Sequence, residues 1–255
     1  MNNKNLDLVC DPKTHTPLTF NGTVLESSGG KTYAIQNDIP VLMDQAELDG
    51  LNLKYQRFYD KVAKAWNWII WFYKFIHKHG PEKRKELLKD LVINPGMTVL
   101  ETSIGTGFNI SLFTKEAHYY GADISMGMLK VCQQENKKWG YDLHIVQANA
   151  EELPYKNNTF DVVFHVGGIN FFNDIPKAIN EMIRVAKPGA QILICDETQE
   201  HVDKFYKKVP FIRRFFKDTL PIAIPMNHIP PAMKNIKLAY AEDNRMYVIT
   251  FTKPR

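Results

Sequence analysis

Short apolar runs alternate with amphipathic stretches between about residues 97 and 200. In the run 191–195 the four residues after Gln191 are continuously apolar, as expected for a strand buried in a parallel sheet, whereas residues 175–183 repeat apolar side chains at helical spacing. Strands that alternate with helices favour a parallel sheet carrying helices on both faces. The pattern therefore predicts a doubly wound α/β fold for this part of the chain.

The flanking segments have different patterns. Residues 236–240 and 246–251 flank a Glu242-Asp243-Asn244 turn, which predicts a closing antiparallel hairpin. The segment before it, at about 201–233, is basic and interrupted by prolines. Residues 51–90 look helical, because aromatic and aliphatic side chains recur there every three to four residues.

Residues 98–109 combine an apolar strand, a carboxylate and a glycine turn. Glycines permit positive φ angles and close approach of a ligand, and we expect a helix to follow whose free N–H groups point at ligand oxygens. The dinucleotide spacing G-x-G-x-x-G is absent, because Ser103 occupies the first glycine position and no third glycine follows Gly107. Glu101 would repel a pyrophosphate and attract a cationic amino group. The turn thus favours a ligand that carries a cation.

This strand-Glu-x-Ser-x-Gly-x-Gly run resembles motif I of the class I S-adenosylmethionine (SAM) methyltransferases, with Ser103 in place of the first of three glycines. The resemblance covers residues 95–200 densely. It is closest to the ubiquinone/menaquinone-biosynthesis type, methyltransferase type 11, which acts mostly on small molecules. It implies a seven-stranded Rossmann-like sheet with an antiparallel last strand. The further matching segments, in the family's order, are 118–123, 149–155, 158–165 and 181–190.

The resemblance also implies roles for single residues. Glu101 would face the methionine end of the cofactor, Asp123 the ribose hydroxyls and Asn149 the adenine amino group, whose proton an amide carbonyl can accept. Ser125 is expected to cap a helix. The cofactor-binding residues predicted in this way are Tyr59, Glu101, Thr102, Ser103, Gly105, Thr106, Gly107, Asp123, Ile124, Met128, Asn149, Ala150, Glu151 and His165.

Methyl transfer from a sulfonium is an in-line displacement, so the protein mainly positions the reactants and excludes water. His165 is the candidate catalytic residue, beside the transferred methyl group. Tyr59 and His228 are further candidate bases. His165 and Tyr59 have a structural reading too, because a strand-end histidine commonly completes a hydrogen bond and Tyr59 suits an ordinary core. Residues 166–169 lack the acidic or Asn-Pro signature of amino-group methylation, which argues against adenine or glutamine amide as the acceptor.

Residues 66–75 and 207–217 mix aromatic and basic side chains. They are consistent with a lid packed on itself, with an apolar pocket for a quinone-like or lipid-like acceptor, or with peripheral contact to anionic lipid. Stacking on single-stranded RNA is a further reading. We expect methyl transfer to a small hydrophobic molecule. The alternatives are an RNA base methyltransferase and a non-catalytic SAM-binding protein.

Residues 6–43 resemble the small zinc-ribbon domain of certain RNA methyltransferases and tRNA methyltransferase activators. A structural zinc site requires four Cys or His ligands, and only Cys10 and His15 remain. We therefore predict no bound metal. The expected parts are a β appendage (1–50), a helical cap (51–90) and a SAM-binding methyltransferase domain (91–255) whose lid is the insert at about 201–233.

The composition and charge of the chain restrict its possible partners and location. The chain has 255 residues, 44% hydrophobic and 24% charged, as in globular proteins, and its net charge of +4 is too small to indicate nucleic acid. Three scattered cysteines favour reduced thiols in the cytoplasm. The N-terminus lacks an apolar signal segment, and the longest apolar run, 66–75, is shorter than the roughly 20 residues that span a bilayer. We expect a soluble, cytoplasmic protein of undetermined oligomeric state.

Overall fold

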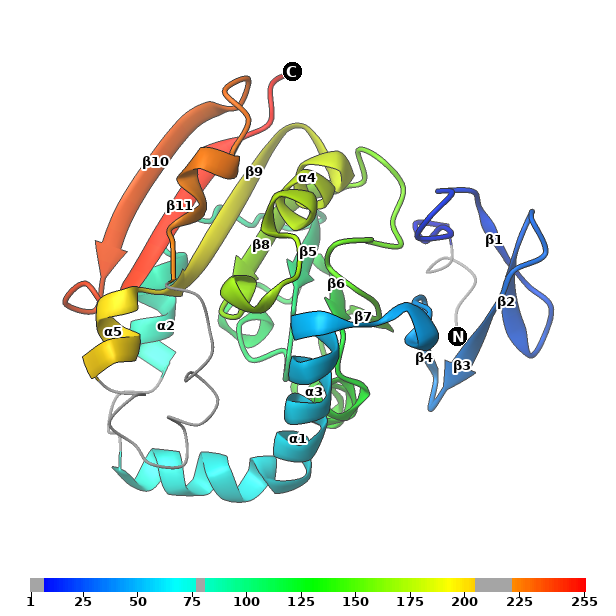
Figure 1. Ribbon diagram of the computed structural model, residues 1–255, viewed down its shortest axis with the longest axis horizontal. Coiled ribbons are helices and arrows are strands. Elements are labelled where there is room, and N and C mark those ends of the chain that lie inside the picture. Colours follow the sequence, from blue (N-terminus) through cyan, green and yellow to red (C-terminus); the bar gives the residue numbers. More distant parts are fainter. Residues whose placement is uncertain (1–6, 77–80, 205–221) are drawn as a thin grey trace.

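The computed structural model describes residues 7–76, 81–204 and 222–255, without the side chains of residues 64, 66–76 and 81 (Figure 1). A seven-stranded sheet forms its centre, as predicted. The strands from β9 to β7 are parallel, whereas β11 is antiparallel to both of its neighbours. In spatial order the strands are β10 (Lys234–Ala241), β11 (Met246–Thr252), β9 (Ala186–Glu197), β8 (Phe160–Val166), β5 (Thr98–Thr102), β6 (His118–Asp123) and β7 (Leu143–Gln147).

Helices cover both faces of this sheet. On one face, α2 (Pro81–Leu88) and α3 (Met126–Trp139) contribute Leu87, Leu88 and Leu129 to a core with Val99 and Phe164. On the other face, α4 (Ile175–Val185) buries the apolar side that the sequence predicts. The hydroxyl of Ser125 accepts a hydrogen bond from the Met128 N–H, so the expected helix cap is confirmed.

One expected helix is absent. Instead of an α-helix after Gly107, the described chain has only the 3₁₀ turn η3 (Ile110–Leu112). Residues 108–117 must return from the carboxyl to the amino edge of the sheet. A helix of this length rises about 15 Å, no more than a five-residue strand, and leaves no chain for the turns at its ends. The expectation that helical N–H groups after Gly107 face the ligand was therefore wrong.

The segment predicted as a helical cap, 51–90, contains α1 (Gly50–Ile76), which lies along the carboxyl edge of the sheet, and α2 on the sheet face (Figure 1). Its role as a cap stays a prediction. The insert begins with α5 (Gln199–Lys204) and ends with η6 (Pro225–His228). Residues 207–217 and the side chains of residues 66–75 lie outside the described residues, so the lid, lipid and RNA readings of these segments stay predictions. No helix in the described ranges combines the length and the apolar character that a bilayer crossing requires.

The N-terminal part forms an antiparallel sheet of β1 (Leu18–Phe20), β2 (Val24–Ser27), β3 (Thr32–Gln36) and β4 (Ile39–Pro40), followed by η2 (Gln45–Glu47). This sheet docks on β7, where the Leu42 N–H donates to the Gln147 carbonyl at 2.8 Å. Val9 and Leu42 also belong to the same core as Val146 and Tyr155. The appendage is thus packed into the main domain.

The two candidate zinc ligands of the appendage lie in different environments. Cys10 is fully buried, and this burial raises the pKa of its thiol to about 11, which disfavours the thiolate that zinc requires. His15 is exposed. Within the described residues no three Cys, His, Asp or Glu side chains gather as a metal site. Folding without zinc stays a prediction, which metal analysis of the purified protein would test.

Candidate active site

The candidate site lies where β5, β6, β7 and β8 end, at the carboxyl edge of the sheet. The chain leaves β5 for β6 on one side and later returns to β8 on the other, so the loops after β5 and β8 diverge. Open α/β sheets bind ligands in the crevice that forms at such a switch point. Most residues predicted to bind the cofactor follow these strand ends.

Glu101 is buried on the α2–α3 face of the sheet. Its Oε1 accepts a hydrogen bond from Asn109 Nδ2 at 2.5 Å, whereas its Oε2 is buried without a partner among the described residues. Burial raises the pKa of the Glu101 carboxyl to about 8. A buried carboxylate with one unpaired oxygen suits a ligand ammonium group, which would supply the missing donor and the compensating charge.

The turn after Glu101 brings the backbone close to the site. Ser103, Gly105 and Gly107 have positive φ angles of 53°, 56° and 75°. A Cβ on Gly107 would lie 2.7 Å from Cys132 Sγ, so only glycine fits there. Ser103 adopts the left-handed conformation that favours glycine, which explains its correspondence to the first glycine of motif I. The turn also includes Thr102, which is buried, and Thr106, which is half-buried.

Asp123 ends β6 and faces the glycine turn. Its Oδ2 accepts from the Gly105 N–H and its Oδ1 from the Ser125 N–H, both at 2.8 Å. Burial raises the pKa of this carboxyl to about 6. With these two backbone bonds each oxygen retains a lone pair, so a diol can still donate to both. Met128 is buried, with its methyl group 3.7 Å from the position a Cβ on Gly105 would take.

The loop after β7 is held mainly by its own contacts. Asn149 Oδ1 accepts from the Glu151 N–H at 3.0 Å. Glu151 Oε1 accepts from Asn52 Nδ2 and the Asn173 N–H, both at 2.8 Å, and from the Asp174 N–H at 3.1 Å. Glu151 therefore joins three segments of the protein. Cofactor contacts of Asn149, the buried Ala150 and Glu151 stay predictions.

Helix α1 lies over the loops that follow β6 and β7. Asp60 Oδ1 accepts from Ser125 Oγ at 2.6 Å and from the Gly127 N–H at 2.8 Å. A Cβ on Gly127 would lie 2.9 Å from Ala63 Cβ, so the glycine permits this close contact. Gln56 Nε2 donates to the carbonyl of Ile124 at 3.2 Å, which fixes that predicted residue through its backbone.

An aromatic group on α1 meets the loop after β8, where η4 (Ile169–Phe171) lies. The rings of Tyr55 and Phe171 stack at 4.0 Å, and Tyr59 packs edge to face with Phe58 at 5.2 Å. Burial raises the pKa of the half-buried Tyr59 hydroxyl, and the carboxylates of Asp196 and Asp123 raise it further. Tyr59 thus lies within the electrostatic reach of acids at the ends of β9 and β6.

His165 lies away from Glu101. It pairs in register with Thr102, so its side chain points to the α4 face, opposite that of Glu101. Its Nδ1 lies 3.2 Å from Thr102 Oγ1, and its ring meets that of Phe172 at 5.4 Å. Burial lowers the pKa of His165 to about 4, so the ring is neutral near pH 7. A catalytic or cofactor contact of His165 stays a prediction. His228 is exposed on η6.

Sequence reasoning missed several residues that shape this site. Asn109 holds Glu101, Asp60 anchors α1, and Asn173 Oδ1 accepts from the Leu51 N–H at 2.8 Å at the start of the same helix. Asp174 had a readable signal, because it caps α4 and precedes Ile175-Pro176. Asn109 had none, since the short η3 turn alone brings it under Glu101.

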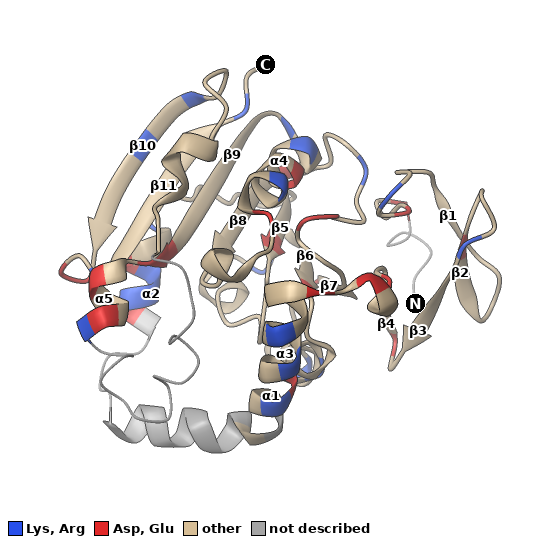
Figure 2. Cartoon of the chain, in the orientation of Figure 1, with Lys and Arg blue, Asp and Glu red and all other residues tan. Residues whose placement is uncertain are grey.

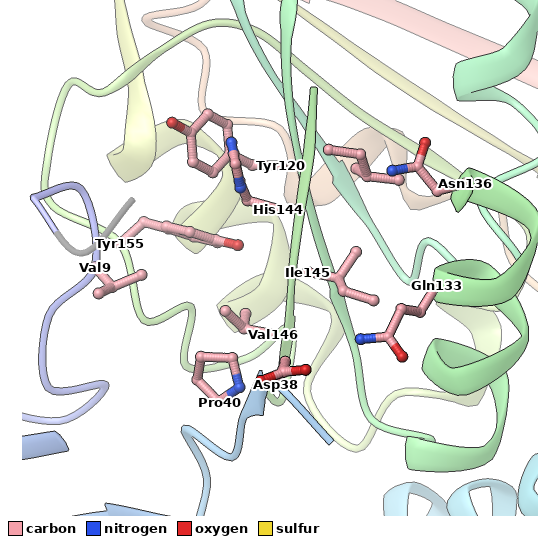
Figure 3. A pocket seen from close by; sticks show the side chains of 11 residues that line it. Val9, Asp38, Pro40, Tyr120, Gln133, Asn136, His144, Ile145, Val146 and Tyr155 are labelled. Atoms are coloured by element: carbon pink, nitrogen blue, oxygen red, sulfur yellow. The ribbon is translucent and has the colours of Figure 1, made fainter. Parts of the chain in front are cut away.

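A cavity of about 190 Å³ lies elsewhere, at the seam between the appendage and β7 (Figure 3). Val9 and Pro40 line it from the appendage, and Tyr120, His144 and Tyr155 line it from the main domain. Another cavity, of about 140 Å³, borders Asn149 and Glu151. None of the residues from Glu101 to Gly107 lines either of these two cavities. The cofactor site is therefore defined by its polar groups.

Strand order, the acid-glycine turn and the unpaired Glu101 oxygen together define a class I SAM-dependent methyltransferase. The methyltransferase domain family matches residues 100–194. The demethylmenaquinone methyltransferase of Listeria welshimeri is 30% identical over 66% of this chain and 72% of its own length. The ubiquinone/menaquinone biosynthesis C-methyltransferase of Idiomarina loihiensis is 38% identical over 41% of this chain, which spans 44% of that relative.

Solved structures show the same fold. A chain from the complex of the Haloferax volcanii Trm112 methyltransferase activator with a methyltransferase has a TM-score of 0.56 and 14% identity, over 77% of this chain and 98% of its own. A Pyrococcus horikoshii OT3 protein has a TM-score of 0.54 and 17% identity, over 68% and 91%. The chain belongs to the family of the demethylmenaquinone and ubiquinone/menaquinone methyltransferases, and its cofactor is SAM.

Proposed function

We propose that this protein transfers the methyl group of SAM to a ring carbon of a quinone-type, hydrophobic acceptor in its reduced form. The observation that carries SAM binding is the buried, unpaired Oε2 of Glu101 beside the Gly105–Gly107 turn. Support for the acceptor class comes from the relatives, whose names specify demethylmenaquinone and ubiquinone/menaquinone biosynthesis. The rings of Tyr55, Phe58, Tyr59 and Phe171 at the same edge suit a flat apolar molecule.

The proposed roles follow from the contacts. Glu101 holds the ammonium group, Asp123 the ribose hydroxyls, and the loop of Asn149 and Ala150 the adenine. SAM supplies an electrophilic methyl group on a sulfonium. Loss of a hydroxyl proton from the quinol makes its ring carbon the nucleophile. After transfer the ring carbon loses its proton, which restores the aromatic ring, and the phenolate oxygen regains a proton, so one proton is released overall. Helix α1 excludes water above these groups.

His165 is the candidate base for the hydroxyl proton. His165 is neutral and its Nε2 is buried without a partner among the described residues, so it is able to accept a hydrogen bond. It lies under Phe172 on the opposite face from Glu101. We therefore propose that His165 supports the loop after β8, and that the acceptor hydroxyl loses its proton to solvent before water is excluded from the site.

The test combines methyl-labelled SAM with the purified protein and either a dithionite-reduced 1,4-naphthoquinone bearing a short prenyl chain or total RNA. We expect label in the organic-soluble quinol and none in RNA. Label in RNA alone would replace this proposal with the RNA methyltransferase alternative. Binding of SAM by calorimetry without transfer to either acceptor would support the non-catalytic alternative. Glu101→Gln serves as the inactive control.

A further inference from the structure

The loop between β6 and α3 is held by side-chain amides from two other parts of the chain. Its residue Ile124 follows Asp123 and precedes the cap residue Ser125, so its backbone carbonyl belongs to no strand or helix. Gln147 Nε2 donates to this carbonyl at 2.9 Å, and Gln56 Nε2 donates to it at 3.2 Å. A carbonyl oxygen has two lone pairs, so both acceptor positions are filled. The peptide that follows Asp123 is therefore fixed.

Gln147 connects this loop to the appendage. It is the last residue of β7 and is only 3% exposed. Its backbone carbonyl accepts from the Leu42 N–H at 2.8 Å, and its backbone forms a parallel bridge with Val41. The appendage thus holds the backbone from which the donor to Ile124 extends.

Gln56 makes a second connection. It lies on α1 and is 6% exposed, and the same Nε2 that donates to Ile124 also donates to Gln45 Oε1 in η2 at 3.0 Å. Because the two N–H bonds of an amide are fixed relative to each other, the acceptor Gln45 orients the donor that Ile124 receives. Two separate connections therefore run from the appendage to one carbonyl.

The side chain of Ile124 also packs on the appendage. A small apolar cluster forms where the appendage meets α1, and its buried members are Val41, Met43 and Leu48. Ile124 packs against this cluster yet stays half-buried, so part of its side chain remains accessible at the carboxyl edge of the sheet. The appendage thus supports Ile124 through both its backbone and its side chain.

The methionine end of the proposed cofactor site is held differently. Glu101 accepts from Asn109, eight residues further along the chain, and neither side chain bonds to the described part of the appendage. Asp123, by contrast, offers its backbone carbonyl to the Ala148 N–H at 3.0 Å, directly after Gln147. The appendage is therefore connected to the side of the site where ribose and adenine are expected.

We propose that Gln147 and Gln56 are positioning residues for the adenosine part of SAM, and that they hold Asp123 and Ile124 where the docked appendage places them. The inference rests on the proposed function, in which Asp123 takes the ribose hydroxyls. A loop that is already held in its binding conformation loses less freedom when the ligand binds, which increases affinity. The appendage then contributes to cofactor affinity through this loop.

The test is calorimetric titration of the full chain with SAM and with 5′-methylthioadenosine, which lacks the amino-acid part. Gln147→Met and Gln56→Met remove the amide donor at nearly constant size. Each should weaken both ligands by the same factor, about 3- to 10-fold. A loss for SAM alone would place the effect at the methionine end and overturn the proposal. A parent protein that binds neither ligand would overturn the proposed function itself.

Gln133→Met is the matched control. Gln133 Nε2 donates to the Asn37 carbonyl at 2.9 Å, so it joins α3 to the appendage by the same kind of bond, and neither residue is a predicted cofactor residue. Both affinities should stay within about twofold. Equal weakening by Gln133→Met would mean that any loosening of the appendage is sufficient, which would contradict the specific roles of Gln147 and Gln56. If Gln147→Met does not fold, Gln56→Met decides, because it leaves the backbone of β7 unchanged.

A double variant tests the connection through η2. Gln45 is exposed, so Gln45→Met removes the acceptor of the Gln56 amide without opening the core. Gln45→Met should weaken SAM about threefold in the parent protein and have no further effect in Gln56→Met, because both changes act on one amide. Equal effects in the two backgrounds would reject this connection.

Acidic side chains near η2 provide a competing explanation. Figure 2 shows acidic residues between β4 and α1, and the sequence identifies them as Asp44, Glu47 and Asp49. A displaced appendage would also displace these charges, which attract the cationic cofactor. The bonds to Ile124 join neutral groups, so the loss of affinity should be unchanged at about 1 M salt, where exposed charges are screened. A loss that disappears at high salt would assign the effect to the acids and overturn the proposal.

Discussion

Four acidic side chains stand at or just after strand ends along the carboxyl edge, and they form two groups. Glu101 and Asp123, at the ends of β5 and β6, keep acceptor positions free. Glu151 accepts three hydrogen bonds on one oxygen, and Asp196 accepts from the side chain and backbone of Asn170 and from the Glu197 N–H. The comparison teaches that an acid bonded only near the glycine turn keeps acceptor positions for a ligand, whereas an acid that accepts from distant segments holds the scaffold together.

Glu101→Gln should have the largest effect on binding. Removing one partner of a buried charge pair costs about 2–5 kcal/mol, so SAM affinity should fall by at least about 30-fold. The free protein should become more stable at pH 7–8, because the buried carboxyl is replaced by a group that does not ionise. Calorimetric titration and thermal unfolding measure the two effects. Glu116→Gln, at an exposed position, is the control, and an equal loss there would contradict the assignment.

Asp123→Ala should have the next largest effect on SAM binding. The loss of hydrogen bonds between a carboxylate and the ribose hydroxyls should weaken SAM binding by about 1.5–3 kcal/mol. Gly105 and Ser125 also lose their acceptor, so the thermal midpoint should fall as well. Titrations with SAM and with methionine separate these effects, because only SAM carries the ribose. An affinity for SAM equal to that of the parent protein would place Asp123 with the scaffold acids.

Glu151→Ala should act on stability. It leaves the amide of Asn52 and the N–H groups of Asn173 and Asp174 without their acceptor, at a cost of about 1–3 kcal/mol for a buried unsatisfied group. Chemical denaturation measures this change. Glu152→Ala is the neighbouring control, since its ion pair with Lys177 is on the surface and contributes about 0–1 kcal/mol. If Glu151→Ala lost SAM binding at unchanged stability, the division between the two groups would fail.

The pH dependence of SAM binding tests the role of Glu101, one of the two acids that keep acceptor positions free. The pKa of Glu101 is raised to about 8, so this group is mostly protonated in the free protein at pH 7. Binding of an ammonium ligand requires the carboxylate and releases a proton, so affinity should rise between pH 6 and 8 by up to about 1.4 kcal/mol per pH unit. The free energy of unfolding of the ligand-free protein changes in the opposite direction. It decreases as the pH rises from the pKa of a glutamate in the unfolded chain towards 8. Calorimetry in buffers of different ionisation enthalpy detects the released proton, and its absence would contradict the role of Glu101.

Ser103→Gly should have the smallest effect. Ser103 has a φ of 53°, a conformation that costs a side-chain-bearing residue about 1–2 kcal/mol. Glycine removes this strain but loses more entropy on folding, so the net gain should be about 0.5–1 kcal/mol. Gly140→Ala, at the left-handed end of α3, should change stability in the opposite direction. A destabilised Ser103→Gly would mean that the serine makes a compensating contact.

Local patterns were sufficient for the repeating elements. The sheet, the Ser125 cap, the apolar face of α4 and the terminal hairpin each follow from short-range periodicity or capping. The ligand-facing and scaffold acids could not be separated in this way, because the donors that Glu151 accepts from include Asn52 and Asn173, which are distant in sequence. The helix expected after Gly107 failed for a related reason, since the span that residues 108–117 must cover depends on the sheet.

Two further glycines near the site are required because segments distant in sequence pack closely against them. Gly121 looks like an ordinary strand residue, yet a Cβ there would lie 2.4 Å from Ile104 Cδ1 in the motif turn. Gly127 likewise allows α1 to pack closely against the start of α3. Neither glycine has a positive φ, so no turn signal marks them, and only the packed structure gives the reason for their size.

The N-terminal sheet and the main sheet share one hydrophobic core, and this determines how the protein unfolds on heating. Val9, Leu42, Val146 and Tyr155 belong to one cluster, and Cys10 and Leu8 exchange backbone hydrogen bonds with Pro154 and Lys156 across the seam. A chain segment that opens must expose all the apolar surface it shares with its neighbour, which makes the two cooperative. The appendage and the main domain should therefore unfold in one calorimetric transition, and amides on both sides of the seam should exchange with solvent at the same rate.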